Sequence, residues 1–314
     1  MKNRCYVFSY NRGYFLENCL ASLERFTTDF FDLVIIDDGS TDQKTVDVLK
    51  KYSQQCKIFF PKKAEGYLKT GGLYKNMNFA LQDAQTNKVD FALFIQDDMQ
   101  VVRKICKKDM ERVQIFFNQN LDSAQLYTCF LKKCNKKWDD ENTLLDISKN
   151  AYFRPIDGPR RSSFSAIGLI NVQRFMKIFG KLKQSEHHND IMGREKKLKM
   201  GLYVYPFMMW LPFPISYRGG KRSFYHRIKE VIAKSGFYPY EEMSMLSQDR
   251  LFHRSLEHRP YAEDFLSCPP VQYMKQWSFT GVNYAFVEMG GWRSVLGIRL
   301  TWIEKRISKI KRII

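Results

Sequence analysis

The chain has 314 residues, of which 44% are hydrophobic and 27% charged, a globular composition that excludes a disordered, collagen-like or repetitive chain. Its 51 basic and 33 acidic residues give a formal net charge of +18, which favours an anionic partner such as nucleic acid, anionic lipid or a phosphorylated substrate. The seven scattered cysteines fit neither a disulfide framework nor a CxxC zinc pair, so we expect a reducing compartment.

Two apolar stretches bear on localisation. The run at 5–8 is too short for the apolar core of a signal peptide and fits a first strand better. The run at 202–217 contains three prolines and is shorter than the ~20 residues needed to span a bilayer, so it predicts one or two buried strands with turns. We therefore expect a cytoplasmic protein without a transmembrane helix.

The first hundred residues alternate strand and helix signals in the βαβ manner. Short apolar runs predict strands at 5–8, 33–36, 57–60 and 91–95. Apolar residues at helical spacing predict helices at about 13–27, 42–53 and 73–86. We expect an α/β fold with a Rossmann-like, mostly parallel sheet flanked by helices.

After residue 100 the pattern loosens. We expect a helix at 103–118, a strand at 125–130, a polar substrate loop at 132–161, a strand or turn at 165–170, and helices at 172–179 and about 190–200, the last ended by Gly201. From about residue 224 the chain is predicted to be helical or irregular. It closes with a basic amphipathic helix at about 295–314.

Acidic residues follow two of the predicted strands. Asp97 and Asp98 come directly after the strand at 91–95, and an acidic cluster at 37–42 follows another strand. The carboxyl ends of parallel strands meet at one edge, where open α/β folds bind ligands, so these acids and the turn at 9–12 should line one crevice. Adjacent carboxylates suit Mg²⁺ or Mn²⁺, which share oxygen ligands with substrate phosphates. The alternative is a solvated turn after a strand.

Five motif segments occur in a recognisable order. They are Val7-Phe8-Ser9-Tyr10-Asn11-Arg12, Val34-Ile35-Ile36-Asp37-Asp38-Gly39-Ser40-Thr41-Asp42, Gly71-Gly72 with Lys75-Asn76, Phe94-Ile95-Gln96-Asp97-Asp98, and Asn189-Asp190 eleven residues before Gly201. With these segments the chain resembles the GT-A glycosyltransferases, specifically those like family 2, over roughly residues 3–225. The acidic element at 37–42 is fairly specific for this resemblance.

The resemblance implies a site for a nucleotide-sugar donor, with UDP as the expected nucleotide. The residues implied to bind the donor are Ser9, Tyr10, Asn11, Asp38, Lys75 and Asp97. Asp38 would accept hydrogen bonds from the base, typically uracil. Lys75 would face the donor, and Asp97 would meet the ribose or support the metal.

The resemblance also implies a metal ligand and a general base. Asp98 would bind Mg²⁺ or Mn²⁺, and Asp190 would deprotonate the acceptor hydroxyl in an inverting transfer. The alternative role of Asp190 is that of an acid favoured by a helix N-terminus. The chain departs from the family at Gln96 and Asn189, which replace acids. At 217–218 it lacks the family's frequent His, so the third metal ligand is unassigned.

We expect a catalytic domain at 1–225, with a nucleotide-sugar half at about 1–100 and an acceptor half at about 101–225. A helical region at 226–314 would follow. The terminal helix at 295–314 carries one apolar stripe accompanied by basic residues, which suits an anionic membrane surface. The alternative is a helix packed on the catalytic domain with a solvated basic face.

The function predicted from these features is a glycosyltransferase of the hexosyltransferase type for surface polysaccharide or glycolipid. Its acceptor would be a saccharide or lipid-linked hydroxyl, at the cytoplasmic face of the membrane. No nucleic-acid partner is expected, because no such binding motif is present. A nucleotidyltransferase on a similar α/β scaffold is an alternative, but it would normally carry a glycine-rich, Arg-bearing loop after its first strand, and 9–13 lacks that glycine richness. A catalytically degenerate basic protein, binding membrane or nucleic acid, would tolerate changes at Asp98 and Asp190.

Overall fold

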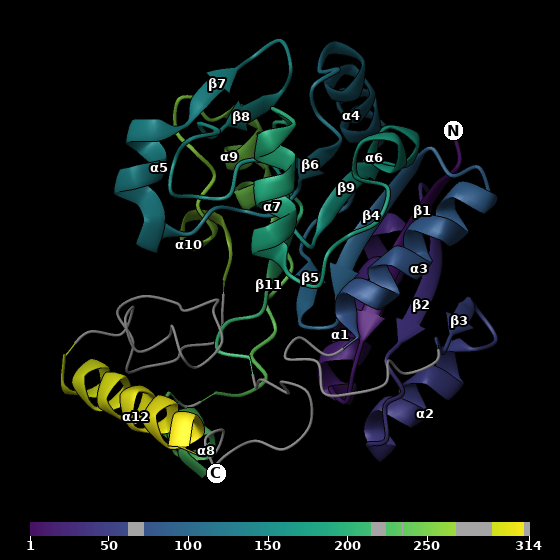
Figure 1. Cartoon of the computed structure of the whole chain (residues 1–314). Helices are drawn as coiled ribbons and strands as arrows, with labels where there is room; N and C mark the ends of the chain where they lie inside the picture. Colours follow the sequence, from purple (N-terminus) through teal and green to yellow (C-terminus); the bar gives the residue numbers. More distant parts are fainter. Residues whose placement is uncertain (62–71, 215–223, 234, 268–290, 311–314) are drawn as a thin grey trace.

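The computed structural model describes residues 1–61, 72–214, 224–233, 235–267 and 291–310. In this part of the chain, nine strands form one sheet in the order β3-β2-β1-β4-β9-β6-β10-β8-β7, with helices on both sides (Figure 1). A smaller sheet pairs β11 with β5.

The amino-terminal half of the large sheet is parallel. Its strands and helices are β1 (Asn3–Ser9), α1 (Gly13–Thr27), β2 (Asp32–Asp37), α2 (Gln43–Tyr52), β3 (Lys57–Phe59), α3 (Leu73–Thr86) and β4 (Phe91–Gln96). Strand β1 pairs in parallel with β2 and β4, and β2 pairs with β3. The predicted α/β class with a Rossmann-like sheet is confirmed, and the predicted elements of this half are all present.

Both faces of the central strands are buried, which explains their apolar composition. Along β1, Cys5 and Val7 join the core with residues of α1 and α2, whereas Tyr6 and Phe8 join the core with residues of α3 and α6 (Val172–Phe179). A strand covered on both faces has no polar side of its own. Polar groups that face a ligand therefore begin where each strand ends.

The carboxyl-terminal half of the sheet is mixed. The elements that follow β4 are β5 (Met99–Val101), α4 (Lys107–Gln119), β6 (Gln125–Tyr127), η1 (Lys133–Asn135), α5 (Lys136–Asn142), β7 (Leu144–Asp146), β8 (Ala151–Phe153), β9 (Gly168–Asn171), α6, α7 (Glu186–Glu195), β10 (Gly201–Tyr203) and β11 (Met208–Trp210), of which β5 and β11 form the smaller sheet. Strand β9 runs antiparallel to β4 and β6, and β8 runs antiparallel to β10 and β7. The segment predicted as a polar loop at 132–161 therefore contains two short helices and a hairpin, and β5 was not predicted.

The helix predicted at 190–200 is wrong in position. Helix α7 begins at Glu186, because the hydroxyl of Ser185 caps it and accepts a hydrogen bond from the amide of His188 at 3.5 Å. It ends at Glu195, and Lys197 adopts a left-handed φ of 55°. Gly201 starts β10 instead of ending the helix. A Cβ at this position would lie 2.3 Å from Phe116 Cε2, so close packing requires glycine there.

Helices follow the last strand. They are α8 (Phe224–Ala233), α9 (Met245–His253), α10 (Ala262–Phe265) and α12 (Gly291–Ile310). The predicted terminal helix is present up to Ile310, and residues 311–314 lie outside the described part. Helix α12 packs on α8, where Lys229 Nζ lies 2.5 Å from Glu304 Oε2. None of the described helices has both the length and the apolarity of a membrane span.

Part of the carboxyl-terminal region shares the core of the large sheet. Tyr240, Leu251 and Leu266 are buried in the same cluster as the residues of β1 and α1. The amide of Tyr240 also donates to Gln100 Oε1 at 3.0 Å. The expected division of the chain at residue 225 stays a prediction.

Candidate active site

The turn between β1 and α1 is held by the acidic end of β2. The hydroxyls of Ser9 and Ser40 each donate to Asp37 Oδ2 at 2.6 Å, and Asp37 is fully buried. Asn11 adopts a left-handed φ of 48°, and its Oδ1 accepts the amide of Thr41 at 2.7 Å. Asn11 and Ser9 therefore shape the turn that was predicted to bind the donor. The structural role of Asp37 was not predicted.

Asp38 lies against the start of α3. Its Oδ2 accepts the amide of Gly72 at 2.8 Å, and its Oδ1 accepts Asn76 Nδ2 at 3.3 Å. Lys75, on the same turn of helix, is half-buried. The structure thus brings together two of the motif segments predicted to face the donor, although they are 34 residues apart at Asp38 and Gly72.

Arg12 connects the two adjacent acids that follow β4. Its Nη1 donates to Asp98 Oδ2 at 2.7 Å, and its Nη2 donates to Asp97 Oδ1. The amide of Tyr10 donates to Asp97 Oδ2 at 3.0 Å, so both oxygens of Asp97 are bonded. Burial raises the pKa of Asp97 to about 6, although the charge of Arg12 acts in the opposite direction. The predicted turn and the predicted acid pair meet, but through an arginine to which sequence reasoning gave no role.

The surroundings of Asp98 fit one contact to a hard cation. Asp98 is 9% exposed, and its Oδ1 is a buried oxygen without a hydrogen-bond partner among the described residues. An orphaned carboxylate oxygen of this kind suits Mg²⁺ or Mn²⁺, which one or two carboxylates hold together with phosphates. The described residues contain no cluster of three His, Cys, Asp or Glu that could hold a metal ion, and 217–218 lie outside them.

The main chain of Asp98 is also fixed. Its carbonyl accepts the amide of Leu211 at 2.8 Å, just after β11, the strand that pairs with β5. Two residues further on, the carbonyl of Phe213 accepts the amide of Gly236 at 2.9 Å. Asp98 is therefore held between the large sheet and the segment that leads to the carboxyl-terminal region.

Asp190 lies in the second turn of α7 and is 2% exposed. Its Oδ1 accepts the amides of Ser162, Ser163 and Phe164 at 3.1, 2.9 and 3.2 Å, and its Oδ2 accepts Arg194 Nε at 2.8 Å. These bonds attach the loop before β9 to α7. The helix starts too early for Asp190 to be the N-terminal acid that was the alternative interpretation.

Two neighbours of Asp190 were given no positive role from the sequence. Asn189 is fully buried, with Oδ1 accepting the amide of Lys183 at 2.8 Å, so it fixes the chain before α7. Glu186 accepts the amide of Ala166 at 3.0 Å and pairs with Arg161 Nη1 at 2.6 Å. The Glu186 side chain is 22% exposed, so this carboxylate is more accessible than that of Asp190.

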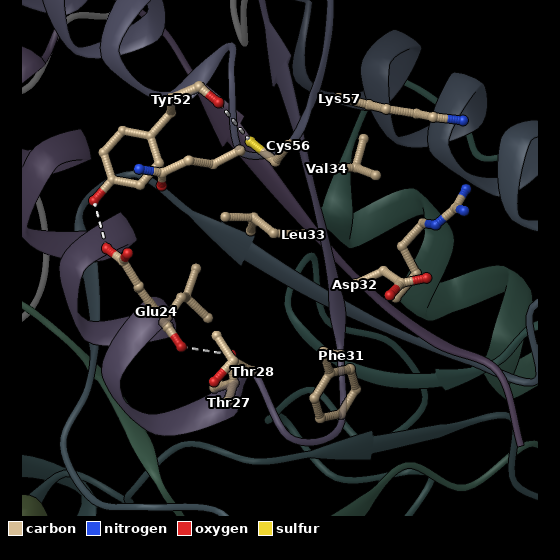
Figure 2. A pocket seen from close by; sticks show the side chains of 13 residues that line it. Glu24, Thr27, Thr28, Phe31, Asp32, Leu33, Val34, Tyr52, Cys56 and Lys57 are labelled. Carbon is tan, nitrogen blue, oxygen red and sulfur yellow. Dashed lines mark hydrogen bonds between the residues drawn. The ribbon is translucent and has the colours of Figure 1, made fainter.

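A cavity of about 510 Å³ lies elsewhere, between the end of α1, the start of β2 and the end of α2. Figure 2 shows Glu24, Asp32, Tyr52 and Lys57 among the side chains around it. Asp32 stands at the amino end of β2, opposite the edge that carries Asp38. The cavity is therefore separate from the candidate active site.

The sequence model of the glycosyl transferase family 2 matches residues 5–142. The chain is thus similar to the family 2 glycosyltransferases. The resemblance predicted from the motifs is confirmed over these residues, which include most of β1, all of β2 and β4, and the acids that follow β2 and β4, whereas Asn189 and Asp190 lie outside the match. No curated protein matches the chain.

Solved structures with a similar fold include that of S. aureus TarS 1-349 in complex with UDP-GlcNAc. It has 16% sequence identity and a TM-score of 0.49, with 74% of this chain and 65% of that chain covered. Another is the mannosyltransferase PcManGT from Pyrobaculum calidifontis in complex with GDP-Man and Mn²⁺. It has 11% identity and a TM-score of 0.45, with 82% and 66% covered. The chain thus spans slightly less than two thirds of either solved chain.

Proposed function

We propose that the protein transfers a sugar from a UDP-sugar to a hydroxyl of a saccharide or lipid-linked acceptor, with inversion at the anomeric carbon. One observation carries the proposal. The ends of β1, β2 and β4 and the start of α3 present Asp38, Asp97 and Asp98 at one edge of the sheet, within residues that match the family 2 model. Carboxylates at this edge can accept hydrogen bonds from the ribose hydroxyls and the base N–H of a nucleotide. They can also bind the cation that neutralises its diphosphate.

Asp38 is proposed to recognise the base. Its two oxygens each accept one hydrogen bond, from Gly72 and Asn76, and a carboxylate offers about four acceptor positions in all. The remaining positions can accept the single N–H of a uracil. The fixed turn at Ser9, Tyr10 and Asn11 would form the wall of this pocket, and Asp97 and Lys75 would lie toward the ribose and the diphosphate.

Asp98 is proposed to hold Mg²⁺ or Mn²⁺ through its unpartnered Oδ1. A divalent cation there would neutralise the charge that develops on the leaving nucleoside diphosphate. The buried position of Asp98 and its bonded carbonyl keep the carboxylate in one orientation, so little reorganisation would be needed when the charge develops.

Asp190 is proposed as the general base. Three backbone amides bond Oδ1, and among the described residues Oδ2 accepts only the Arg194 bond, so one acceptor position remains for the acceptor hydroxyl. Because Asp190 is 2% exposed, the hydroxyl can reach it only when the loop at 158–164 moves aside. A single base is sufficient for direct, inverting displacement.

Helix α12 is proposed to lie on an anionic membrane, which would suit a lipid-linked acceptor and the synthesis of a surface polysaccharide or glycolipid. Val295, Ile298 and Trp302 are exposed on it, and the guanidinium of Arg306 lies 3.8 Å from the centre of the Trp302 ring. Exposed apolar and aromatic residues beside basic ones are typical of interfacial helices. The protein would then act as a peripheral membrane enzyme of the cytoplasmic face.

The first experiment is a thermal-shift screen of nucleoside diphosphates and their sugars with Mn²⁺ present, followed by a transfer assay. Selective stabilisation by UDP and its sugars is expected, because a ligand that binds only the folded state raises its stability by mass action. The Asp98→Ala variant should lose transfer, whereas Asp122→Ala, an exposed acid paired with Lys199, should keep it. Full transfer by Asp98→Ala would contradict the metal-binding role proposed for Asp98.

A further inference from the structure

The guanidinium of Arg12 occupies the carboxylates to which a divalent cation would bind. It donates to Asp98 Oδ2 at 2.7 Å and to Asp97 Oδ1, and its side chain is 16% exposed. Two carboxylates and one guanidinium leave one net negative charge in this cluster, where the acid pair alone would carry two. The pair is therefore already half neutralised from within the protein.

A metal ion next to the acid pair would face this positive charge at short range. Inside a protein, charges of the same sign a few ångströms apart repel strongly, and the repulsion doubles for a divalent ion. The described residues supply no third His, Cys, Asp or Glu ligand to offset it. Of the four oxygens of the acid pair, only Asp98 Oδ1 has no partner within the described part of the chain. A cation bound by both oxygens of Asp98 must therefore first displace an Arg12 bond.

We propose that Arg12 is the internal counterion of Asp97 and Asp98 and competes with a divalent cation for them. Binding of the donor diphosphate would draw the guanidinium away, so that the cation binds firmly only together with the nucleotide. This inference rests on the proposed donor site, and it adds an order of assembly to that site.

Position and chemistry favour the diphosphate as the group that receives Arg12. Arg12 follows directly on the turn at Ser9, Tyr10 and Asn11, and the carbonyl of Ser9 accepts the amide of Asp38 at 3.0 Å. A guanidinium fork pairs with two phosphate oxygens as well as with two carboxylate oxygens. Arg12 Nε is buried and has no hydrogen-bond partner among the residues that the structure describes, so this donor is available to a phosphate oxygen.

The test measures Mn²⁺ binding by electron paramagnetic resonance of the free ion, without nucleotide and then with UDP. Without nucleotide, wild type is expected to bind Mn²⁺ weakly, and Arg12→Gln to bind it about tenfold more tightly or better. Added UDP should strengthen Mn²⁺ binding in wild type far more than in Arg12→Gln. In the double variant Arg12→Gln/Asp98→Asn the gain should disappear, which would locate the ion at Asp98.

Arg25→Gln is the matched control, since it makes the same change at the other end of α1, where Arg25 is exposed. Its Mn²⁺ affinity should equal that of wild type. If Arg12→Gln does not fold by circular dichroism, Arg12→Met replaces it. Methionine removes the same positive charge and keeps a long unbranched side chain, so this variant must also bind Mn²⁺ more tightly than wild type.

An Mn²⁺ affinity of the folded Arg12 variant that equals or falls below that of wild type would overturn the proposal. So would tight Mn²⁺ binding by wild type in the absence of UDP. Calorimetry with UDP is run separately. If UDP fails to bind, the proposed donor site is wrong, while the comparison of Mn²⁺ affinities without nucleotide still decides the role of Arg12.

Discussion

Gly72 leaves the space that the Asp38 carboxylate occupies. A Cβ at residue 72 would lie 2.0 Å from Asp38 Oδ1, while the Gly72 amide donates to Asp38 Oδ2 at 2.8 Å. The absence of a side chain at one residue and the orientation of the carboxylate at the other are therefore linked. This explains why a glycine precedes α3 next to an acid from the end of β2.

The Gly72→Ala variant should bind UDP about tenfold more weakly, a loss of about 1.4 kcal/mol, because the methyl group must push the Asp38 carboxylate aside. Its φ of −81° suits alanine, so the fold should lose no more than about 1 kcal/mol for the poorer helix cap. Calorimetry with UDP and urea unfolding would measure both quantities. Asp38→Asn serves as the reference variant and should weaken UDP binding similarly. Unchanged UDP affinity in Gly72→Ala would argue that Asp38 does not touch the base.

Asp190→Asn tests the proposed base and separates it from a purely structural role. Asparagine keeps an oxygen for the amides of Ser162, Ser163 and Phe164, so the loop should stay attached. Turnover should fall by about 10²-fold or more if this carboxylate takes the proton, with UDP affinity nearly unchanged.

Glu186→Gln is the competing variant, because Glu186 lies one turn before Asp190 on α7 and is the more accessible of the two. It should keep turnover within about tenfold of wild type if Asp190 is the base. The reverse ranking, with Glu186→Gln inactive and Asp190→Asn active, would transfer the role to Glu186. Melting curves of both variants would show whether either loss comes from unfolding.

The buried pair of Arg103 and Asp109 predicts how stability depends on pH. Arg103 Nη1 and Nη2 bond the two oxygens of Asp109 at 2.9 Å each, and Tyr203 Oη donates to Asp109 Oδ1 at 2.9 Å. Burial acts to raise the pKa of Asp109, but the bonds and charge of Arg103 outweigh it and lower the pKa below the ordinary 3.8. A carboxyl whose pKa is lowered in the folded state stabilises the fold above its unfolded pKa, and this contribution is lost as the pH falls through the folded value.

Arg103→Met should therefore cost about 3–5 kcal/mol at pH 7, because it leaves a buried carboxylate unpaired. The cost should shrink as the pH falls, because the buried Asp109 without its arginine takes up a proton at a higher pH than it does in wild type. Urea unfolding at several pH values would measure the difference, with Arg25→Met as the exposed control. A cost that is the same at low and neutral pH would contradict this account.

The membrane proposal is best tested on the exposed face of α12. Removing the helix would also remove Glu304, which bonds the buried Lys229, so a truncation would confuse membrane binding with stability. The double variant Val295→Ser/Trp302→Ser should bind phosphatidylglycerol vesicles about tenfold more weakly than wild type. Leu144→Ser, an exposed change on β7, should leave vesicle binding unaltered. Equal sedimentation of the double variant and wild type with these vesicles would remove α12 as the contact.

The sequence was sufficient for the order and class of the elements because the central strands are apolar on both faces. It was not sufficient for the contact of Arg12 with Asp97 and Asp98. That contact depends on the register in which Phe8 stands opposite Gln96, and the apolar pattern of β1 and β4 is compatible with other registers. Asp37 was missed for a similar reason, since its burial follows from the serines at 9 and 40.

Errors in the second half have local causes. The start of α7 follows from the Ser185 cap, which stands before a polar stretch without clear apolar spacing. Strand β5 is three residues long and gains its partner, β11, from more than a hundred residues away. Short strands paired at such a distance carry little signal in their own sequence.

The bond between the Leu211 amide and the Asp98 carbonyl has a practical consequence. The segment after β11 steadies the main chain of Asp98 from outside the large sheet, and Phe213 continues that contact to Gly236. A fragment ending before Leu211 would keep every acid of the candidate active site and still lose the hydrogen bond that fixes the loop after β4. Inactivity of such a fragment would then indicate that Asp98 is no longer held in one orientation, and not that a chemical group is missing.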